Sequence, residues 1–289
     1  KIFISLSAKK TKIKLQLMIK LKKKEIEYSL VPHLSRGNRG PQPAVGIWRI
    51  VRAILYRLKT GCQWRELPMR SLFNKSIHWQ TVYYHFKKWG RDGSWRKVWV
   101  VLLDFNRQYL DMSSISLDGS HTIARQGGEK VGYQPRKRAK TTNLLFLTDC
   151  QGIPLACSSP MAGNHHDCYQ VLNSMNQMDR ILKEANIDLE GIFMNADAGF
   201  DLGQLRQWAN RKGIQANFDF NKRNAQNGDR EDYFDPLLYQ ERFVIERTNA
   251  WIDGFKALLI RYEKLACTWL DLHYISFSVI LLRKIGFKL

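Results

Sequence analysis

Cysteine is scarce in the 289-residue chain, which has only five, and none forms a Cys-x-x-Cys pair. This scarcity argues against a zinc finger and is typical of a reducing compartment. The chain also lacks an apolar run of the ~20 residues that a membrane helix requires. The longest such run, Tyr274–Leu282, is flanked by charged residues and is interpreted as a core helix. We therefore expect a cytoplasmic protein without a membrane partner.

Acidic residues are rare in the first part of the chain. Residues 1–112 contain 24 Lys and Arg against 6 Asp and Glu, a net charge of +18, whereas residues 113–289 contain 22 against 20, a net charge of +2. A basic region beside a balanced one indicates that the first binds a polyanion and the second does something else. The alternative is a basic protein whose charge serves solubility alone.

Residues 1–27 are interpreted as a basic, disordered or loosely helical arm, because nine lysines fall within residues 1–24. The first methionine is Met18, and our hypothesis is that the natural start lies near it. A turn-rich linker is expected at Ser35–Pro43.

Residues 28–112 are predicted to form a small all-helical module. Apolar residues recur at helical spacing in Gly46–Lys59, Ile77–Trp89 and Ser94–Tyr109. Three short helices with a basic outer face are typical of a helix-turn-helix DNA-binding domain, and the many aromatic residues are expected in its core.

After residue 112 the pattern changes to strands that alternate with helices. The predicted strands are Ile115–Leu117, Asn143–Thr148, Ile153–Ser158, Leu189–Asn195 and Ile214–Phe220, and the predicted helices among them are Asp167–Asn186 and Leu202–Gly213. Residues 221–232 are polar and predict a loop. This order indicates an α/β domain with a mixed sheet and helices on its faces.

Two of these strands end in a carboxylate, Asp118 in SLDGSHT and Asp197 in NADAGFD. Asp-Gly is also an ordinary turn signal, and Asp197 or Asp201 could cap the following helix. Ligands bind where strands end in sheets of this type, so the two acids could instead meet at one site.

A third acid is offered by the predicted helix Gln240–Tyr262. Its apolar face is expected to carry Val244, Trp251, Phe255 and Leu258, and its other face carries Arg242, Glu246, Asn249, Asp253 and Lys256. That second face could be a solvated stripe with a weak Arg242–Glu246 pair. Directed at the strand ends, it would let Glu246 complete a cage of three carboxylates, which suits Mg²⁺ or Mn²⁺.

Asp118 in SLDGSHT, Asp197 in NADAGFD and Glu246 in YQERFVIERTNAWIDGF together resemble the DDE signature of bacterial insertion-sequence transposases. The similarity is to the insertion-sequence five family, within the insertion-sequence four-like superfamily. WRIVRAILYRLKTGCQWRELP and WQTVYYHFKKW resemble its helical DNA-binding region. The resemblance extends from about Tyr28 to Lys284.

The resemblance implies a ribonuclease-H-like catalytic domain over residues 113–289 and metal-dependent DNA cleavage and strand transfer. It implies that Asp118, Asp197 and Glu246 hold the metal, Mg²⁺ or Mn²⁺ and two ions in all, and that Tyr239 and Arg242 belong to the superfamily's tyrosine–arginine–glutamate motif. The motif's lysine is absent, since Asp253 stands in its place, and Lys256 is the nearest substitute for its DNA contact. The implied partners are terminal inverted repeats and target DNA, bound by a homodimer.

Three further features remain. The segment Tyr133–Asn143 carries Arg136, Lys137, Arg138 and Lys140, which we expect to contact DNA phosphates rather than only water. His121 could touch the scissile phosphate or stabilise a turn. The GNHHDC segment, with His165 and His166, lacks the spacing of a zinc site.

Two rivals stay open beside the transposase. One is a nuclease of the same fold that cuts DNA without joining it, and the other is an inactive remnant that only binds DNA.

Overall fold

The computed structural model describes residues 21–36, 45–221 and 232–286. The chain forms two compact units, a helical unit (residues 1–102, 252–260 and 267–289) and a sheet unit (residues 103–251 and 261–266). The contacts thus group the last helix with the N-terminal helices, whereas the predicted boundary after residue 112 placed it in the catalytic domain. The predicted linker and the predicted loop at 221–232 lie almost wholly outside the described residues.

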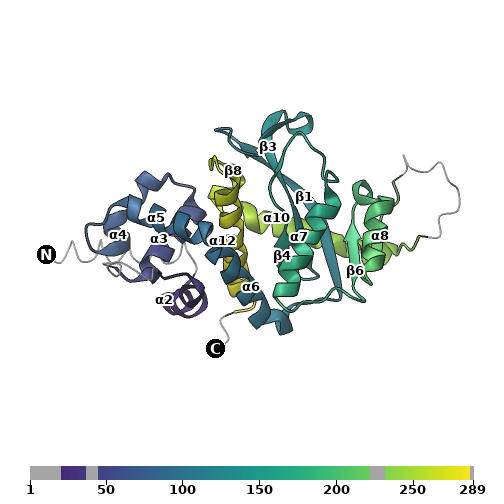
Figure 1. Ribbon diagram of the computed structural model, residues 1–289, viewed down its shortest axis with the longest axis horizontal. Helices are drawn as coiled ribbons and strands as arrows, with labels where there is room; N and C mark the ends of the chain where they lie inside the picture. The colour runs from purple at the N-terminus through teal and green to yellow at the C-terminus, as the bar shows by residue number, and fades with distance from the viewer. Residues whose placement is uncertain (1–20, 37–44, 222–231, 287–289) are drawn as a thin grey trace. The chain divides into compact units, whose positions relative to one another are not determined.

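The helical unit is built from the helices that the apolar periodicity predicts, coloured purple to blue in Figure 1, together with the last helix. Its longer helices are α3 (Ile47–Thr60), α5 (Trp79–Arg91), α6 (Ser94–Asn106, which continues into the sheet unit) and α12 (Ala266–Lys284), and shorter ones are α4 (Met69–Phe73) and α11 (Lys256–Leu259). α3 ends at Gly61, whose φ of 68° is the left-handed conformation that glycine adopts most easily.

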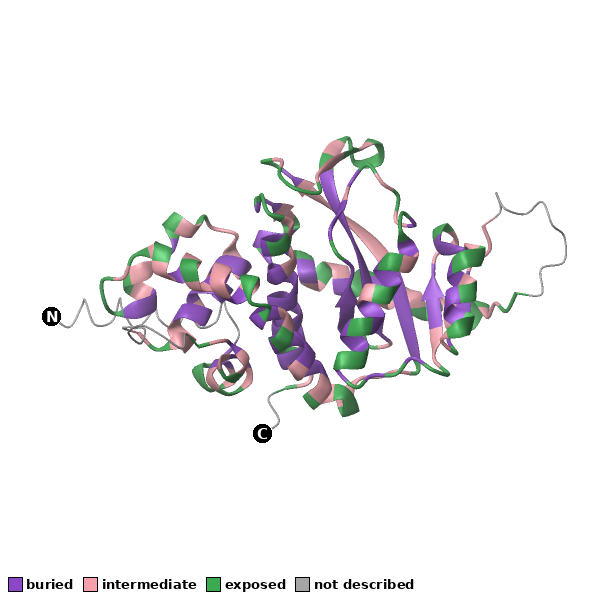
Figure 2. Cartoon of the chain, viewed as in Figure 1, coloured by how far each residue is buried: buried purple, intermediate pink, exposed green. Residues whose placement is uncertain are grey.

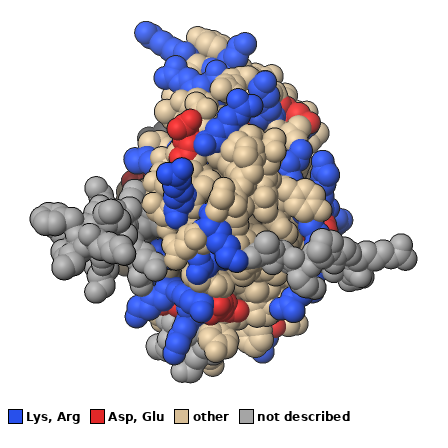
Figure 3. Space-filling model, turned by 90° about the vertical axis from the view of Figure 1, so that its left-hand side faces the viewer, with Lys and Arg blue, Asp and Glu red and all other residues tan. Residues whose placement is uncertain are grey.

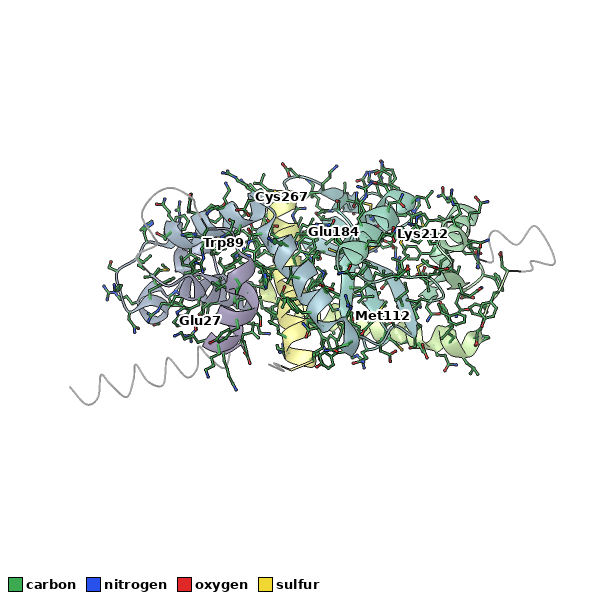
Figure 4. All side chains as sticks on the ribbon, turned by 60° about the horizontal axis from the view of Figure 1, so that its bottom comes forward. Glu27, Trp89, Met112, Glu184, Lys212 and Cys267 are labelled. Atoms are coloured by element: carbon green, nitrogen blue, oxygen red, sulfur yellow. The ribbon has the colours of Figure 1, made fainter. Side chains whose placement is uncertain are left out.

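Aromatic side chains fill the core of this unit, as predicted. Trp89, Trp95 and Trp99 are each at most 1% exposed, and the rings of Trp89 and Trp95 meet edge to face at 5.3 Å. The side chain of Trp89 lies among the helices in Figure 4. Burial of this much aromatic surface is the main stabilising contribution that the sequence offers here.

The described end of the predicted basic arm, residues 21–27, is largely helical, which is one of the two states predicted for the arm. Helix α2 (Lys23–Glu25) continues into a π-helical turn, Ile26–Leu30, and a 3₁₀ turn, Val31–His33. Ile26 and Leu30 are almost completely buried, so apolar residues scattered among the lysines anchor this segment. Residues 1–20 lie outside the described part of the chain.

The last helix, α12, is buried along most of its length, as its purple colour in Figure 2 shows. It contains the apolar run Tyr274–Leu282 and packs within the helical unit, where Phe277 meets Trp99 at 5.4 Å between ring centroids. No described helix is both long enough and apolar enough to span a membrane. The run Tyr274–Leu282 is therefore part of a core helix, as the sequence analysis predicts.

The sheet unit is a mixed sheet in the strand order β2–β3–β1–β6–β7, with β4 and β5 also paired to β3. Its strands are β1 (Ser114–Ala124), β2 (Gly132–Gln134), β3 (Ala139–Asp149), β4 (Pro154–Cys157), β5 (Met161–Ala162), β6 (Phe193–Ala196) and β7 (Gln215–Phe218). β3 runs antiparallel to β1 and β4, whereas β6 and β7 run parallel to β1 and to each other. The five strands β4–β3–β1–β6–β7 have the order and directions of a ribonuclease-H-like fold, as expected.

Two helices of this unit follow the predicted pattern, α7 (Val171–Glu184) and α8 (Gly203–Arg211). The ammonium group of Lys212 donates to Asp179 Oδ2 at 2.7 Å and ties the end of α8 to α7 (Figure 4). The buried residues of α7, among them Met175, Met178 and Leu182, recur at the spacing of one helical face.

Strand β1 does not end at Asp118, which corrects the prediction of a short strand at Ile115–Leu117. It continues through the Asp-Gly pair to Ala124, because β3 provides an antiparallel partner as far as Ile123 opposite Thr141. The parallel pairing with β6 does end there, with Leu117 opposite Ala196. Asp118 is therefore the first residue beyond the parallel ladder rather than the end of its strand.

The predicted helix Gln240–Tyr262 is not continuous, which is a second correction. It consists of α9 (Pro236–Gln240), a 3₁₀ turn at Glu241–Phe243, α10 (Val244–Asp253) and α11, and it gives way to the short strand β8 (Ile260–Arg261). Phe255 has an extended backbone between α10 and α11. The buried residues of α10 are Ile245, Thr248 and Ile252. Of these, Ile245 and Ile252 lie one position after the predicted Val244 and Trp251.

Candidate active site

Asp118 and Asp197 lie side by side because of the strand register. Leu117 of β1 is paired with Ala196 of β6, and each is followed directly by an aspartate. Neighbouring parallel strands keep residues in register at a spacing of ~4.8 Å. The two acids that the sequence analysis selected therefore meet at one edge of the sheet.

The carboxyl group of Asp118 is held away from water. Burial raises its pKa to about 6, and the negative charges of Asp197 and Asp167 act in the same direction. A hydrogen bond of 2.8 Å from the Gly119 N–H to Oδ1 and the positive charge of Arg242 oppose the rise. The group is thus an ionisable oxygen donor in a place that favours a bound cation.

Helix α10 brings a third set of groups to Asp118. The amide of Asn249 lies 3.5 Å from Asp118 Oδ2, and the charge of Arg242, one turn before the helix, also reaches Asp118. Glu246 lies between these two residues at helical spacing, so all three share one side of the segment. The side chain of Glu246 is exposed, and of the predicted stripe it is Arg242 and Asn249 that reach Asp118.

The donors present fit a hard divalent cation. The Oδ1 atom of Asn249 is buried beside Asp118 and has no hydrogen-bond partner among the described residues, and the nearby groups are mainly carboxylate oxygens. Within the described ranges, however, no three His, Cys, Asp or Glu side chains are close enough together to form a metal-binding group. The structure brings Asp118 and Asp197 together but leaves Glu246 outside a closed cage.

Asp197 caps a short 3₁₀ turn rather than the helix after Leu202 that the alternative interpretation expected, because α8 has no side-chain cap. Its Oδ1 accepts a hydrogen bond of 2.9 Å from the Gly199 N–H at the start of a short 3₁₀ turn, Ala198–Phe200. Asp201, in contrast, is fully buried and pairs with Arg206 at 2.9 Å. Asp201 is therefore a structural residue, whereas Asp197 keeps a second oxygen for a ligand.

The other residues of the predicted motif separate into two groups. Tyr239 lies on α9, and its pKa is raised by burial while the charge of Arg242, whose guanidinium lies 5.5 Å from the ring, opposes the rise. These two residues are close to the carboxylates, since the charge of Asp197 also acts on Tyr239. Lys256 belongs to the helical unit, where its backbone packs against Gly61.

The predicted basic segment forms the tip of the β2–β3 hairpin. Arg136, Lys137, Arg138 and Lys140 are all exposed there, and Arg138 takes a left-handed backbone conformation (φ 47°) that turns the chain into β3. The Lys137 ammonium donates to the carbonyl oxygen of His121 on β1. The hairpin is thus attached to the strand that carries Asp118.

His121 does not share the face of β1 that carries Asp118, because the two residues are an odd number of positions apart. Its Nδ1 lies 3.2 Å from Thr141 Oγ1 and its Nε2 lies 3.4 Å from Asp167 Oδ1. Of the two roles expected for His121, the geometry favours a structural one.

Sequence reasoning missed Asp167 in the GNHHDC segment. Burial opposes its ionisation, but hydrogen bonds from His121 and Asn143 together with the charges of His121 and Arg136 lower its pKa below the usual value. Of the two histidines, His165 stacks on Tyr169 at 3.7 Å, and His166 Nδ1 accepts a bond of 3.2 Å from the Cys168 N–H. The available signal was the adjacent glycine and amide residues, which are typical of a tight turn rather than of a metal site.

Comparison with protein families gives two matches that together cover most of the chain. Residues 109–281 match the family described as "Transposase DDE domain", and residues 25–99 match the family described as "Putative transposase of IS4/5 family". The first match contains Asp118, Asp197 and Glu246, and the second contains helices α3 to α5.

Two relatives from Burkholderia cepacia are similar over part of the chain. The "Putative transposase for insertion sequence element IS402" is 30% identical over 151 residues, which are 52% of this chain and 65% of that protein. The "Insertion element IS402 uncharacterized 16.2 kDa protein" is 29% identical over 113 residues, 38% of this chain and 75% of that protein. The matched part thus spans slightly less than two thirds of the first relative.

Among solved structures, a pre-cleavage Mos1 transpososome matches with a TM-score of 0.28 and 11% identity, over 88% of this chain and 83% of that one. A Mos1 mariner paired-end complex with Mn matches with a TM-score of 0.28 and 12% identity, over 88% and 82% of the two chains.

Proposed function

The chain belongs to the transposase DDE domain family, and from that premise we propose that it binds the ends of an insertion sequence and cuts and joins DNA strands there. The observation that carries the proposal is the register that sets Asp118 and Asp197 side by side under α10. Two carboxylates at one sheet edge, with an acid on the covering helix, are suited to phosphoryl transfer.

Asp118 and Asp197 would hold the divalent cations, Mg²⁺ or Mn²⁺, with Glu246 as the third ligand from α10. The chemistry supplied by such ions is stabilisation of the attacking and leaving oxygens in an in-line displacement at phosphorus. Arg242 balances the carboxylate charge at Asp118 and would attract a phosphate to the same edge. The Asn249 amide orients the Asp118 carboxyl group.

The DNA would be held by two basic surfaces, one in each unit. In the sheet unit this is the β2–β3 hairpin with its four exposed cations. In the helical unit, α5 borders a hollow of about 560 Å³ whose lining includes Gln80, Tyr84, Lys87, Lys88 and Arg91. Lys and Arg side chains outnumber acidic ones on the face seen in Figure 3. Phosphate contacts of this kind position a duplex, and Gln80 and Tyr84 would reach its bases.

The test uses a plasmid that carries the natural gene with its flanking genomic DNA, so that the element ends are included. We expect the full-length protein with Mg²⁺ or Mn²⁺ to release strands at those ends and to join them to a second plasmid. Glu246→Gln should abolish cleavage, because it removes one oxygen ligand of the metal. It should leave metal-free DNA binding nearly unchanged, because glutamine has almost the same shape as glutamate.

The outcomes distinguish the rivals. Cleavage without joined product would favour a nuclease, and binding without metal-dependent cleavage would favour an inactive remnant. Equal loss of binding and cleavage in Glu246→Gln would count against the role of Glu246 as a ligand. Sedimentation of the protein with and without the end DNA tests the expected homodimer.

A further inference from the structure

The segment Gly163–Asp167, which follows β5, is seated directly on three neighbouring strands. We call it the Gly163–Asp167 turn. Each contact is made possible by a missing side chain. A Cβ on Gly119 of β1 would overlap the Asp167 carboxylate, and a Cβ on Gly132 of β2 would overlap Asn164. A Cβ on Gly163 itself would overlap Thr141 of β3. The turn therefore requires glycine at three places that are far apart in the sequence.

Hydrogen bonds hold the Gly163–Asp167 turn against these strands. The Gly163 N–H donates to the Thr141 carbonyl oxygen at 3.0 Å, and the side-chain amide of Gln134 donates to the Gly163 carbonyl oxygen at 3.1 Å. At the other end, Asn143 Nδ2 donates to Asp167 Oδ1 at 2.7 Å. The same Oδ1 lies 3.4 Å from His121 Nε2. Asp167 is thus fixed from β1 and β3 together.

Asp167 contacts the strand next to Asp118 but from the opposite face. Successive residues of a strand point to opposite faces, so Gly119 and His121 face the turn while Asp118 faces α10. The Asp167 carboxylate lies against Gly119, and the N–H of Gly119 donates to Asp118 Oδ1 at 2.8 Å. The position of this peptide group therefore helps to set the orientation of the Asp118 carboxyl group, together with the Asn249 amide on the other oxygen.

We propose that Asp167 is a positioning residue that holds Asp118 in the orientation needed for metal binding by pressing on Gly119 from behind. This inference rests on the proposed function, because it concerns the same metal site. Asp167 itself does not bind the metal: it lies on the other face of β1, and its Oδ1 is already held by Asn143 and His121. Groups that orient a metal ligand in this way typically change metal affinity or activity by about 10–100-fold.

The experiment compares three variants of the full-length protein in an Mn²⁺ titration without DNA, in which electron paramagnetic resonance measures free Mn²⁺. We expect Asp167→Ala to weaken Mn²⁺ binding and to slow plasmid cleavage, each by about 10–100-fold. Asp167→Asn keeps the shape and an oxygen acceptor, so it should stay within a few-fold of the wild type. Gly119→Ala should resemble Asp167→Ala, because its methyl group displaces the carboxylate.

The double variant Gly119→Ala/Asp167→Ala is the sharpest arm. Since both changes break the same contact, their effects should not add, and the double variant should be no worse than either single variant. Gly203→Ala is the matched control, because a Cβ there meets no atom within 4 Å. It should behave as the wild type does, and thermal unfolding and metal-free DNA binding should show that all variants are folded.

The inference fails if Asp167→Ala binds Mn²⁺ as tightly as the wild type, or if the effects of the two single changes add. If Asp167→Asn is as damaging as Asp167→Ala, the charge itself is required and Asp167 is a ligand rather than a positioning residue. If the wild-type protein neither binds Mn²⁺ nor cleaves the plasmid, the proposed function fails, and that result is distinct from the others.

Discussion

Two aspartates, one in each unit, both have a raised pKa but differ in their surroundings. The pKa of Asp118 is raised to about 6 and that of Asp271, on α12, to about 7, in each case first by burial and then by a neighbouring carboxylate. Asp118 lies where a second acid, an asparagine amide and an arginine converge. Asp271 lies against the backbone of Gly90 on α5, with Asp92 as its charged neighbour. A raised carboxyl pKa therefore shows only that the group is shielded from water. The candidate active site is identified by the several polar groups that converge on Asp118.

The largest expected effect separates the two residues by activity. Asp118→Asn should slow DNA cleavage by ~10³-fold or more, because the loss of a metal ligand removes several kcal/mol of transition-state stabilisation. The matched variant Asp271→Asn should cleave at the wild-type rate. Quantification of end cleavage on the plasmid substrate measures the rates of both variants. A cleavage defect in Asp271→Asn would contradict the proposed difference between the two aspartates.

The next effect concerns stability and pH. The pKa of Asp271 is higher in the folded chain than in the unfolded chain, so the folded state binds the extra proton and stability falls as pH rises from about 4 to about 7. Above that window the buried charge is a constant cost of up to ~4 kcal/mol. Asp271→Asn should therefore raise the melting temperature at pH 8 and flatten its pH dependence, as calorimetry between pH 5 and pH 8 would measure. An unchanged pH profile would contradict this account.

The smallest effect compares the basic surfaces of the two units. Neutralising Arg136, Lys137, Arg138 and Lys140 together to glutamine should weaken DNA binding at least tenfold at moderate salt and reduce the slope of log K against log salt by up to about 4. Neutralising Lys87, Lys88 and Arg91 on α5 should reduce the slope by up to about 3. Binding titrations at several salt concentrations measure both slopes. If the slope is unchanged for one variant, the surface altered in that variant does not contact the DNA phosphates.

The elements of the fold could be predicted where local pattern and tertiary structure agree. The helices at Gly46–Lys59 and Ile77–Trp89 and the main strands and helices in chain order after residue 112 follow from apolar periodicity alone. The pattern was misleading at Asp118-Gly119, a common turn pair, because β3 supplies an antiparallel partner that carries the strand onward. The pattern was also misleading from residue 240 to residue 262. There the helix is interrupted at Phe255, and the segment continues into the short strand β8.

The candidate site could be predicted as a set of residue types but not as an arrangement. Asp118 and Asp197 were selected from their positions after apolar strands, and only the register shows that they are adjacent. The network around Asp167 joins residues from four separate segments, and no local pattern links Gly119 to a carboxylate that follows it by 48 positions along the chain. Such long-range contacts depend on sheet order, which periodicity does not encode.

The continuation of β1 beyond the end of its ladder to β6 also affects how fast its backbone amides exchange with solvent. From Asp118 onward the strand stays paired with β3, whereas its ladder to β6 has ended at Leu117; its other partner is the short strand β8, and the Arg125 N–H donates to the Arg261 carbonyl oxygen of β8. Amide hydrogens of this stretch that bond neither to a neighbouring strand nor to a side chain, as that of Gly119 does, should exchange with solvent much faster than those that bond to β3. The strand that carries Asp118 is thus also a place where we expect the sheet to open locally.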